Sequence, residues 1–527
     1  MDARIPVVRL FQDRIARYGL KSLLTIPQSK SAVRNYEILA LLSALLVMFV
    51  WALSSPVGSS PDDDYHLASA YCSHGTRSGL CEASNDRTTV SVPAQITRTY
   101  ECYLSGSRTP DCLQSVESGL VSTTRFNSIN MYPKFYYWAN GLLANPDAEV
   151  GSLLMRILSI AVFVVIVTLA YLVSSALLRP VIPLALVIGV VPFGLFIFPS
   201  NNPSSWAVSG IFCFWVGLSS SFGGITRTDS LTSLSIALLG GVIAISARPD
   251  SALLLLLATV AVFFQVRTRF LKFQSSTKYI LIIVLVSFLF LIDRISNRTE
   301  VATQGFIQQQ SKFSHIDILF DNFQSYPKYF MAFFGFSLWG NTPLGHLGWF
   351  QVSVPILASA IVFFTATFFV FRNSKNWKNP ERSSLFFLSI SIFLIPLIVH
   401  QLDGTLIGDL LQPRYLYSLF LIILTLCISN PRRDTPIGKY LRLKLILGLT
   451  LAHGLTLHQF IRSYTTGFDS GFSLDLGDMW WGSNPVSPQL VWVIGTVAFG
   501  LLAASSVQLY FAKERPNEPD ASVFRSV

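Results

Sequence analysis

Three consecutive carboxylates stand beside a histidine near the start of the chain, at Asp62, Asp63, Asp64 and His66. Like charges this close together raise the pKa of at least one member, and a carboxyl with a raised pKa can serve as a general base. The same residues also suit a solvated acidic turn that caps a following helix, because Asp is a favoured N-cap residue. The sequence therefore allows a catalytic base or a capping turn at this position.

Two arginines elsewhere in the chain are candidates for binding a phosphate group. Arg248 lies in the segment Arg248-Pro249-Asp250 between two short apolar runs, and Arg414 immediately precedes another apolar run. A planar guanidinium can hold phosphate oxygens through two parallel hydrogen bonds. Alternatively, Arg248 is the ion-pair partner of Asp250, and Arg414 extends to lipid headgroups. Both pairs of interpretations stay open.

Aromatic residues in the same polar segments are candidates for substrate contacts. The run 131–138 contains Tyr132 and Lys134 and suits either an interfacial aromatic belt or a platform for a sugar ring or polyprenyl chain. Tryptophan is common at membrane interfaces, so Trp349, Trp480 and Trp481 are weak signals individually. The sequence contains no Cys/His metal spacing and no glycine pattern typical of nucleotide-binding loops.

The composition indicates which elements must position these residues. The chain has 527 residues, of which 51% are hydrophobic and only 13% are charged, whereas soluble domains carry about 25% charged residues. The charges cluster between apolar runs long enough for membrane helices. We therefore predict an all-α polytopic integral membrane protein in contact with the lipid bilayer. The net charge of +10 is then explained by basic cytoplasmic loops, and we expect no nucleic-acid partner.

About twelve apolar runs are candidate membrane spans. They lie near residues 39–53, 152–178, 181–199, 205–223, 231–247, 251–265, 279–293, 352–371, 384–400, 415–429, 442–459 and 489–511. Basic residues occupy alternate loops, which places the N-terminal segment 1–36 and the tail 512–527 in the cytoplasm. The transmembrane domain is then 37–511, and any chemistry is expected on the exterior face, in pieces 54–151, 294–351, 401–414 and 460–488.

The cysteines divide into two groups. Cys213 and Cys427 lie in apolar runs and are expected to be packing residues. The other four lie in the first exterior loop, where an oxidising environment favours two disulfides. Four cysteines allow three connectivities, and the short loops favour Cys72–Cys81 with Cys102–Cys112.

Together, these segments resemble a family of uncharacterised polytopic membrane proteins, defined by a domain of unknown function, that is common in actinobacterial envelope gene clusters and related to the GT-C glycosyltransferases. The resemblance rests on the order of short elements after or before successive spans. They are Pro61 to His66, Tyr132-Pro133, Ser200 to Ser204, Gly345 to Trp349, Gln412 to Tyr415, and Trp480-Trp481. The chain departs from the family pattern at Asp63, where Glu is usual, and at Pro413, where Gly is usual.

The resemblance implies a GT-C-like plan in the plasma membrane with an extracytoplasmic active site. Its donor would be a sugar linked to polyprenyl phosphate, and its acceptor an envelope glycan or glycolipid. Asp62 or Asp63 would be the base facing the acceptor, and a divalent cation, Mg or Mn, could bind both. Donor phosphate would contact Arg248, Arg414 and His66. Substrate-binding residues would be Tyr132, Lys134, Asn202, Trp349, Gln412, Tyr415, Trp480 and Trp481.

Two other functions fit the same features. Twelve spans suit a transporter or flippase for lipid-linked sugars, although the chain has no internal repeat. A glycan polymerase or ligase would use the same acid and arginines with two glycan-binding grooves.

Overall fold

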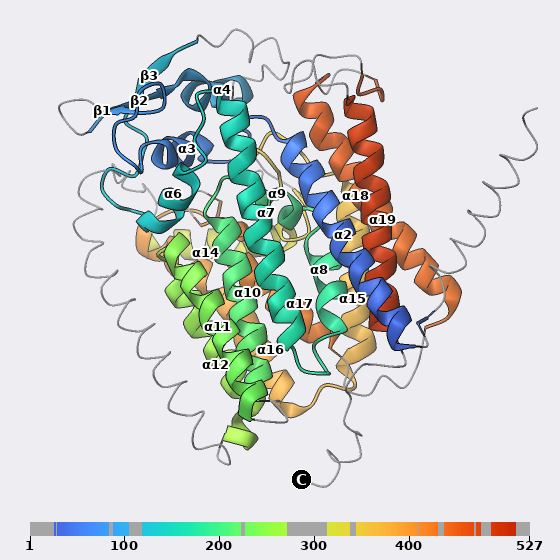
Figure 1. The fold of residues 1–527 in the computed structure, drawn as a ribbon. Coiled ribbons are helices and arrows are strands. Elements are labelled where there is room, and N and C mark those ends of the chain that lie inside the picture. The colour runs from blue at the N-terminus through green and yellow to red at the C-terminus, as the bar shows by residue number, and fades with distance from the viewer. Residues whose placement is uncertain are drawn as a thin grey trace, which may run out of the picture.

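The structure is a computed structural model. It describes residues 26–27, 29–83, 88–104, 118–222, 227–270, 314–337, 344–408, 411–429, 437–467, 471–475 and 486–512. This part of the chain is mostly helical (Figure 1). In chain order the elements are α2 (Lys30–Ser54), α3 (Asp63–Tyr71), β1 (Glu82–Ala83), β2 (Val90–Pro93), α4 (Ala94–Leu104), β3 (Leu120–Thr123), α6 (Lys134–Gly141), α7 (Ala148–Val173), α8 (Val181–Gly189), α9 (Phe193–Ile197), α10 (Ser204–Ser221), α11 (Arg227–Ala247), α12 (Ser251–Phe270), α14 (His315–Ala332), α15 (Ile356–Ser374), α16 (Asn379–Asp403), η1 (Pro413–Leu416), α17 (Tyr417–Ile428), α18 (Lys439–Tyr464) and α19 (Pro488–Tyr510).

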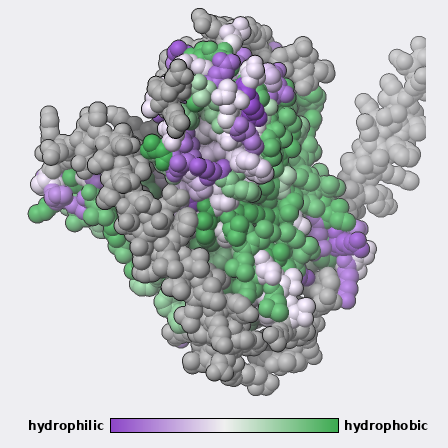
Figure 2. All heavy atoms as spheres, turned by 60° about the vertical axis from the view of Figure 1, so that its left-hand side comes forward, coloured by the Kyte–Doolittle hydropathy of each residue, from purple (hydrophilic) through white to green (hydrophobic). Residues whose placement is uncertain are grey.

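Seven helices in the described residues are long and apolar enough to cross a membrane. They are α2, α7, α11, α15, α16, α18 and α19. Large apolar side chains on several of them are more than half exposed, among them Leu42, Val165, Val242, Phe364 and Phe386. A broad apolar band covers the middle of the molecule in Figure 2, below a more polar end. Apolar surface on this scale is expected where lipid replaces water as the solvent.

The predicted number of about twelve spans is not confirmed. Two shorter apolar helices, at Ser251–Val266 and Pro413–Ile428, accompany the seven long ones in the described residues. The apolar run 181–199 is divided into α8 and α9 instead of forming one helix. The run 279–293 lies outside the described residues. The chain is therefore a mostly helical, multi-pass membrane protein, and the described residues do not give its total number of membrane spans.

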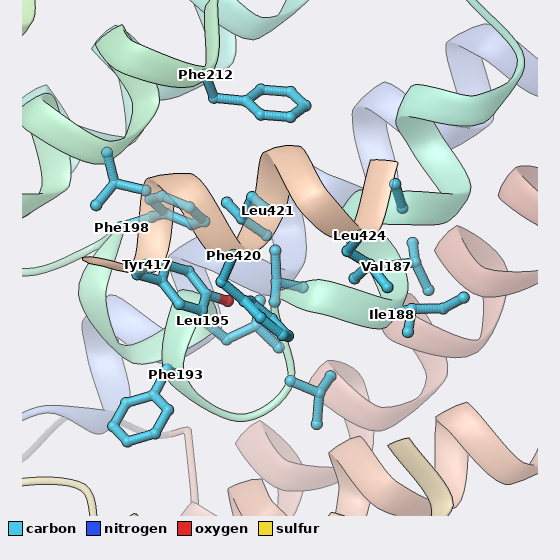
Figure 3. Packing of buried hydrophobic residues seen from close by; sticks show 14 of the residues in the cluster. Val187, Ile188, Phe193, Leu195, Phe198, Phe212, Tyr417, Phe420, Leu421 and Leu424 are labelled. Atoms are coloured by element: carbon cyan, nitrogen blue, oxygen red, sulfur yellow. The ribbon is translucent and has the colours of Figure 1, made fainter. Parts of the chain in front are cut away.

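The shortest apolar helices lie in the interior of the bundle. All but one of the residues of α17 are buried, and α8, α9 and α10 are similarly enclosed. Figure 3 shows Tyr417, Phe420 and Leu421 of α17 packed among apolar side chains from the neighbouring elements, including Phe198 and Phe212. A helix that is apolar on every side is stable where protein surrounds it. These buried helices can therefore be shorter than the thickness of a bilayer.

The helices alternate in direction, so their ends gather in two groups. At one end, Arg248 after α11 donates a hydrogen bond to Ser204 at the start of α10, and the Tyr464 hydroxyl of α18 reaches the carbonyl of Ser59 after α2. This end also carries α3, α4, α6 and the strands (Figure 1). At the opposite end, Asn373 of α15 caps the last carbonyls of α17. Segments predicted to share one side of the membrane thus meet at one end.

The first loop contains a small sheet that the all-α prediction did not include. Its strands are antiparallel in the order β1-β2-β3. The predicted Cys72–Cys81 disulfide is present, and it joins the end of α3 to the start of the sheet. Cys102 is also disulfide-bonded, whereas Cys112 lies outside the described residues. Cys213 and Cys427 are free and buried, as expected for packing residues.

Candidate functional site

The three consecutive carboxylates begin α3 and point into different environments. Asp62 occupies the N-cap position with a left-handed backbone, at φ 62°. This conformation is uncommon for a residue with a Cβ, although Asp tolerates it better than most. The Asp62 side chain is 41% exposed, whereas the Asp63 and Asp64 side chains are 0% and 3% exposed. The turn therefore leaves one of the three carboxylates accessible.

Asp62 lies between two guanidinium groups from distant parts of the chain. Its Oδ1 is 3.5 Å from Nη2 of Arg125, and its Oδ2 is 3.5 Å from Nη2 of Arg414. Arg125 also forms an ion pair with Asp64 through two nitrogens. Two cations thus offset the charge of the acidic turn and hold it against the start of α17.

Asp63 instead forms an ion pair inside the protein. Its Oδ2 accepts a hydrogen bond from the backbone N–H of Ser60 at 3.2 Å and lies 3.6 Å from Nη2 of Arg156 on α7. Burial raises the pKa of Asp63 to about 7, although the positive charge of Arg156 opposes the shift. Arg156 itself is completely buried and donates hydrogen bonds to the carbonyls of Ala52, Ser55 and Pro56.

Arg248 is held by several partners next to the acidic turn. Both oxygens of Asp250 accept hydrogen bonds from it at 2.9 Å, and the Ser204 hydroxyl accepts another at 3.0 Å. Its guanidinium carbon lies 4.5 Å from the ring centroid of Tyr415 and 5.8 Å from that of Tyr132. The ion pair with Asp250, one of the two interpretations that the sequence left open, is therefore present, and the negative charge of Asp250 raises the Arg248 pKa against the effect of burial.

Arg414 lies at the junction of two small pockets. Its guanidinium carbon is 5.2 Å from the ring centroid of Tyr415 and 5.8 Å from that of Phe350. The first pocket combines polar and aromatic residues and has a volume of about 20 Å³, which is room for one or two water molecules. The second lies beyond Arg414 and is lined by Arg248, Asp250, Tyr415 and apolar residues of α10 and α12. Arg414 therefore lines both pockets, and Arg248 lines the second.

His66 lies in a cluster of tyrosine side chains next to the acidic turn. Its Nδ1 is 2.8 Å from the hydroxyl of Tyr137, and its ring packs against Tyr65 and Tyr132. Burial lowers the His66 pKa to about 3, which makes the ring neutral at physiological pH. His66 can therefore contribute a hydrogen bond to the site and no positive charge.

The other predicted site residues are distributed unevenly. Asn202 donates a hydrogen bond to the carbonyl of Pro61 at 3.2 Å, beside the acidic turn, and both Asn202 and Gln412 line the first pocket. Trp349 uses its indole N–H to bind the carbonyl of Gly58 at 2.6 Å, so it anchors the chain after α2. Lys134 is exposed at the start of α6. Trp480 and Trp481 lie outside the described residues.

The carboxylates of the acidic turn do not fit a divalent cation. In the described residues, no group of three or more His, Cys, Asp or Glu side chains is arranged to hold a metal ion. Asp62, Asp63 and Asp64 each face an arginine guanidinium. The negative charge of these carboxylates is therefore already balanced by arginine side chains, and the proposed reaction does not use Mg or Mn.

Two arginines at the site were not identified from the sequence. Arg156 lies in the apolar run 152–178, and a lone charge in a candidate span is itself a signal of a buried partner. Arg125 lies in a polar segment without any comparable signal, and its pairing with Asp62 and Asp64 depends on how the first loop folds.

Comparison with known proteins gives a family and no further assignment. No curated protein matches the chain, and no solved structure matches it. Residues 45–423 match the profile of the family described as "Predicted membrane protein (DUF2142)", and this region includes the acidic turn and both pocket arginines. The chain therefore belongs to the DUF2142 family of predicted membrane proteins.

Proposed function

We propose that this protein is a GT-C-like membrane glycosyltransferase. It would transfer a sugar from a polyprenyl-phosphate donor to an envelope glycan or glycolipid. One observation carries the proposal: the half-exposed carboxylate of Asp62 lies 3.5 Å from the guanidinium of Arg414, and Arg414 lines the first pocket. A general base beside a phosphate-binding cation is the pair of groups that such a transfer needs.

In the proposed reaction, Asp62 accepts the proton of the acceptor hydroxyl. The acceptor oxygen then forms a bond to the anomeric carbon while the bond between that carbon and the phosphate oxygen breaks. Polyprenyl phosphate leaves with an additional negative charge, which Arg414 and Arg248 stabilise. Asp63 is a poor candidate for the base because its side chain is 0% exposed and faces Arg156.

The position of the site supports a lipid-linked donor. Arg248 follows the end of α11, and Arg414 precedes the start of α17. Both therefore lie where apolar helices end, which is the depth at which a lipid phosphate meets the protein. With cytoplasmic termini, as the basic loops predict, this end of the bundle faces the exterior of the plasma membrane.

The test compares Asp62→Asn with the wild type and with Glu82→Gln, an exposed carboxylate in the same loop. Purified proteins in liposomes receive polyprenyl-phosphate-linked sugars and envelope glycan acceptors, and the glycosylated product is measured. We expect Asp62→Asn to lose about 100-fold or more in transfer rate, since general-base catalysis contributes that much. Glu82→Gln should match the wild type, and all three proteins should have similar melting temperatures.

Other outcomes would redirect the proposal. Transfer by Asp62→Asn at the wild-type rate would exclude Asp62 as the base. Movement of the lipid-linked sugar across the liposome membrane without any product would indicate a flippase. Product that forms only from lipid-linked oligosaccharides would indicate a polymerase or ligase.

A further inference from the structure

The loop that ends the second large exterior segment has an unusual backbone. Leu347 and Val352 pair in antiparallel fashion across a tight turn. Within the turn, Gly348 and Phe350 both have positive φ, at 63° and 68°. Left-handed backbone is unfavourable for a bulky L-residue such as Phe350. Such a conformation persists only where the surroundings impose it, and it is concentrated at functional sites.

The surroundings of this loop impose the conformation through two neighbours, Gly58 and Tyr464. The Trp349 indole is bound to the carbonyl of Gly58 at 2.6 Å, and the Gln351 amide donates to the hydroxyl of Tyr464 at 3.0 Å. A Cβ at Gly348 would lie 2.7 Å from that same hydroxyl, so the backbone packs directly against α18. The Trp349 side chain therefore anchors the loop to the segment after α2 and does not line the first pocket, whereas the neighbouring Phe350 does.

Phe350 and His346 form one wall of that pocket beside Arg414. The guanidinium carbon of Arg414 lies 5.8 Å from the centroid of the Phe350 ring. Nδ1 of His346 donates a hydrogen bond to the carbonyl of Phe350 at 2.7 Å. Burial lowers the pKa of His346, so in the neutral ring Nε2 carries a lone pair and accepts hydrogen bonds. Asn202 and Ser200 line the same pocket and offer further polar groups.

We propose that this pocket is the glycosyl subsite and that Phe350 is its specificity-determining platform. With the donor phosphate on Arg414, the attached sugar would lie over the Phe350 ring, and a sugar hydroxyl would donate to Nε2 of His346. An aromatic face paired with a few convergent polar groups is the usual composition of a small-ligand site. The pocket holds only one or two waters as it stands, so the sugar must displace side chains on entry. This inference rests on the proposed function.

The test uses two ligands and three variants in detergent or nanodiscs. The ligands are decaprenyl phosphate and decaprenyl-phosphate-linked mannose, and the variants are Phe350→Gly, Phe350→Leu and Phe350→Tyr. Phe350→Gly removes the ring while relieving the positive φ, so it should melt no lower than Phe350→Leu. We expect Phe350→Gly and Phe350→Leu to bind the mannosylated lipid about three- to tenfold more weakly than wild type. Phe350→Tyr should retain wild-type binding, and the affinity for decaprenyl phosphate should not change in any variant.

Each other result overturns the inference in a distinguishable way. Unchanged binding of both lipids by Phe350→Gly would exclude the platform and leave the proposed function intact. An equal loss for both lipids would show that the ring supports Arg414 instead of the sugar. Failure of the wild type to bind either lipid would overturn the proposed function together with this inference.

Discussion

Two neighbouring carboxylates of the acidic turn belong to two different regions of the molecule. Asp63 and Arg156 form a buried pair in which both side chains are 0% exposed. Asp62 and Arg414 form a second pair, with side chains 41% and 11% exposed, which we call the pocket pair because Arg414 lines both pockets. The residue types are identical, and only solvent access and surrounding hydrogen bonds differ. The buried pair connects α2, α3 and α7, whereas the proposed function requires the pocket pair to exchange its partners for a substrate.

The largest effect is expected from breaking the buried pair with Arg156→Met. This change leaves Asp63 buried without its cation and leaves the carbonyls after α2 without their donor. Removing one partner of a buried ion pair costs about 3–5 kcal/mol. The yield of monodisperse protein and its melting temperature should both fall sharply.

The matched control for that change is Arg98→Gln, which removes an exposed pair with Glu101. Exposed pairs contribute about 0–1 kcal/mol, so its melting temperature should stay near the wild-type value. Adding Asp63→Asn to Arg156→Met should recover part of the loss, because no buried charge remains. Normal melting of Arg156→Met alone would contradict the structural role of the buried pair.

A smaller effect, confined to function, is expected from Arg414→Lys. Lysine keeps the charge and loses the planar fork that holds phosphate oxygens. We expect the affinity for polyprenyl phosphate to fall about tenfold, with little change in melting temperature. Arg156→Lys should show the opposite pattern, with lower stability and unchanged affinity per folded molecule. If both variants lose stability equally, the distinction between the two pairs fails.

The pH dependence of stability should report on Asp63. Its pKa in the folded protein is about 7, above the ordinary value of 3.8. The folded state therefore binds the proton more tightly than the unfolded state, and this contribution to stability is lost as pH rises through 7. The melting temperature should rise by a few degrees from pH 8 to pH 5. In Asp63→Asn this part of the pH dependence should disappear, whereas Asp62→Asn should retain it.

The smallest effect concerns the backbone at Asp62. Its φ of 62° suits glycine and strains alanine. Neither Asp62→Gly nor Asp62→Ala has a carboxylate, so the difference between them isolates the backbone. We expect Asp62→Gly to be more stable by about 1 kcal/mol, measured by thermal unfolding at one pH. Equal stability would mean that the turn relaxes when the side chain is removed.

Much of the site was predictable because its members stand at the ends of apolar runs. Alternating spans bring the segments around Asp62, Asn202, Arg248 and Arg414 to one side. The structure places Asn202, Arg248 and Arg414 in the walls of two pockets that share Arg414, and Asp62 forms an ion pair with Arg414. The roles within that group were not predictable. Whether Asp62 or Asp63 is accessible depends on the left-handed backbone of Asp62. Whether Trp349 or Phe350 lines the pocket depends on the conformation of the tight turn that contains both residues.

Hydropathy and charge along the chain are enough to establish a multi-pass helical membrane protein whose ionisable groups lie mostly in loops. Hydrophobicity acts segment by segment, so it can be summed along the chain without knowledge of the fold. Which charges form pairs, in contrast, depends on how the helices pack. Arg156 and Asp63 are far apart in sequence, and so are Arg414 and Asp62. Charge pairing depends on distance in space and on exclusion of water, and both arise only when the helices pack.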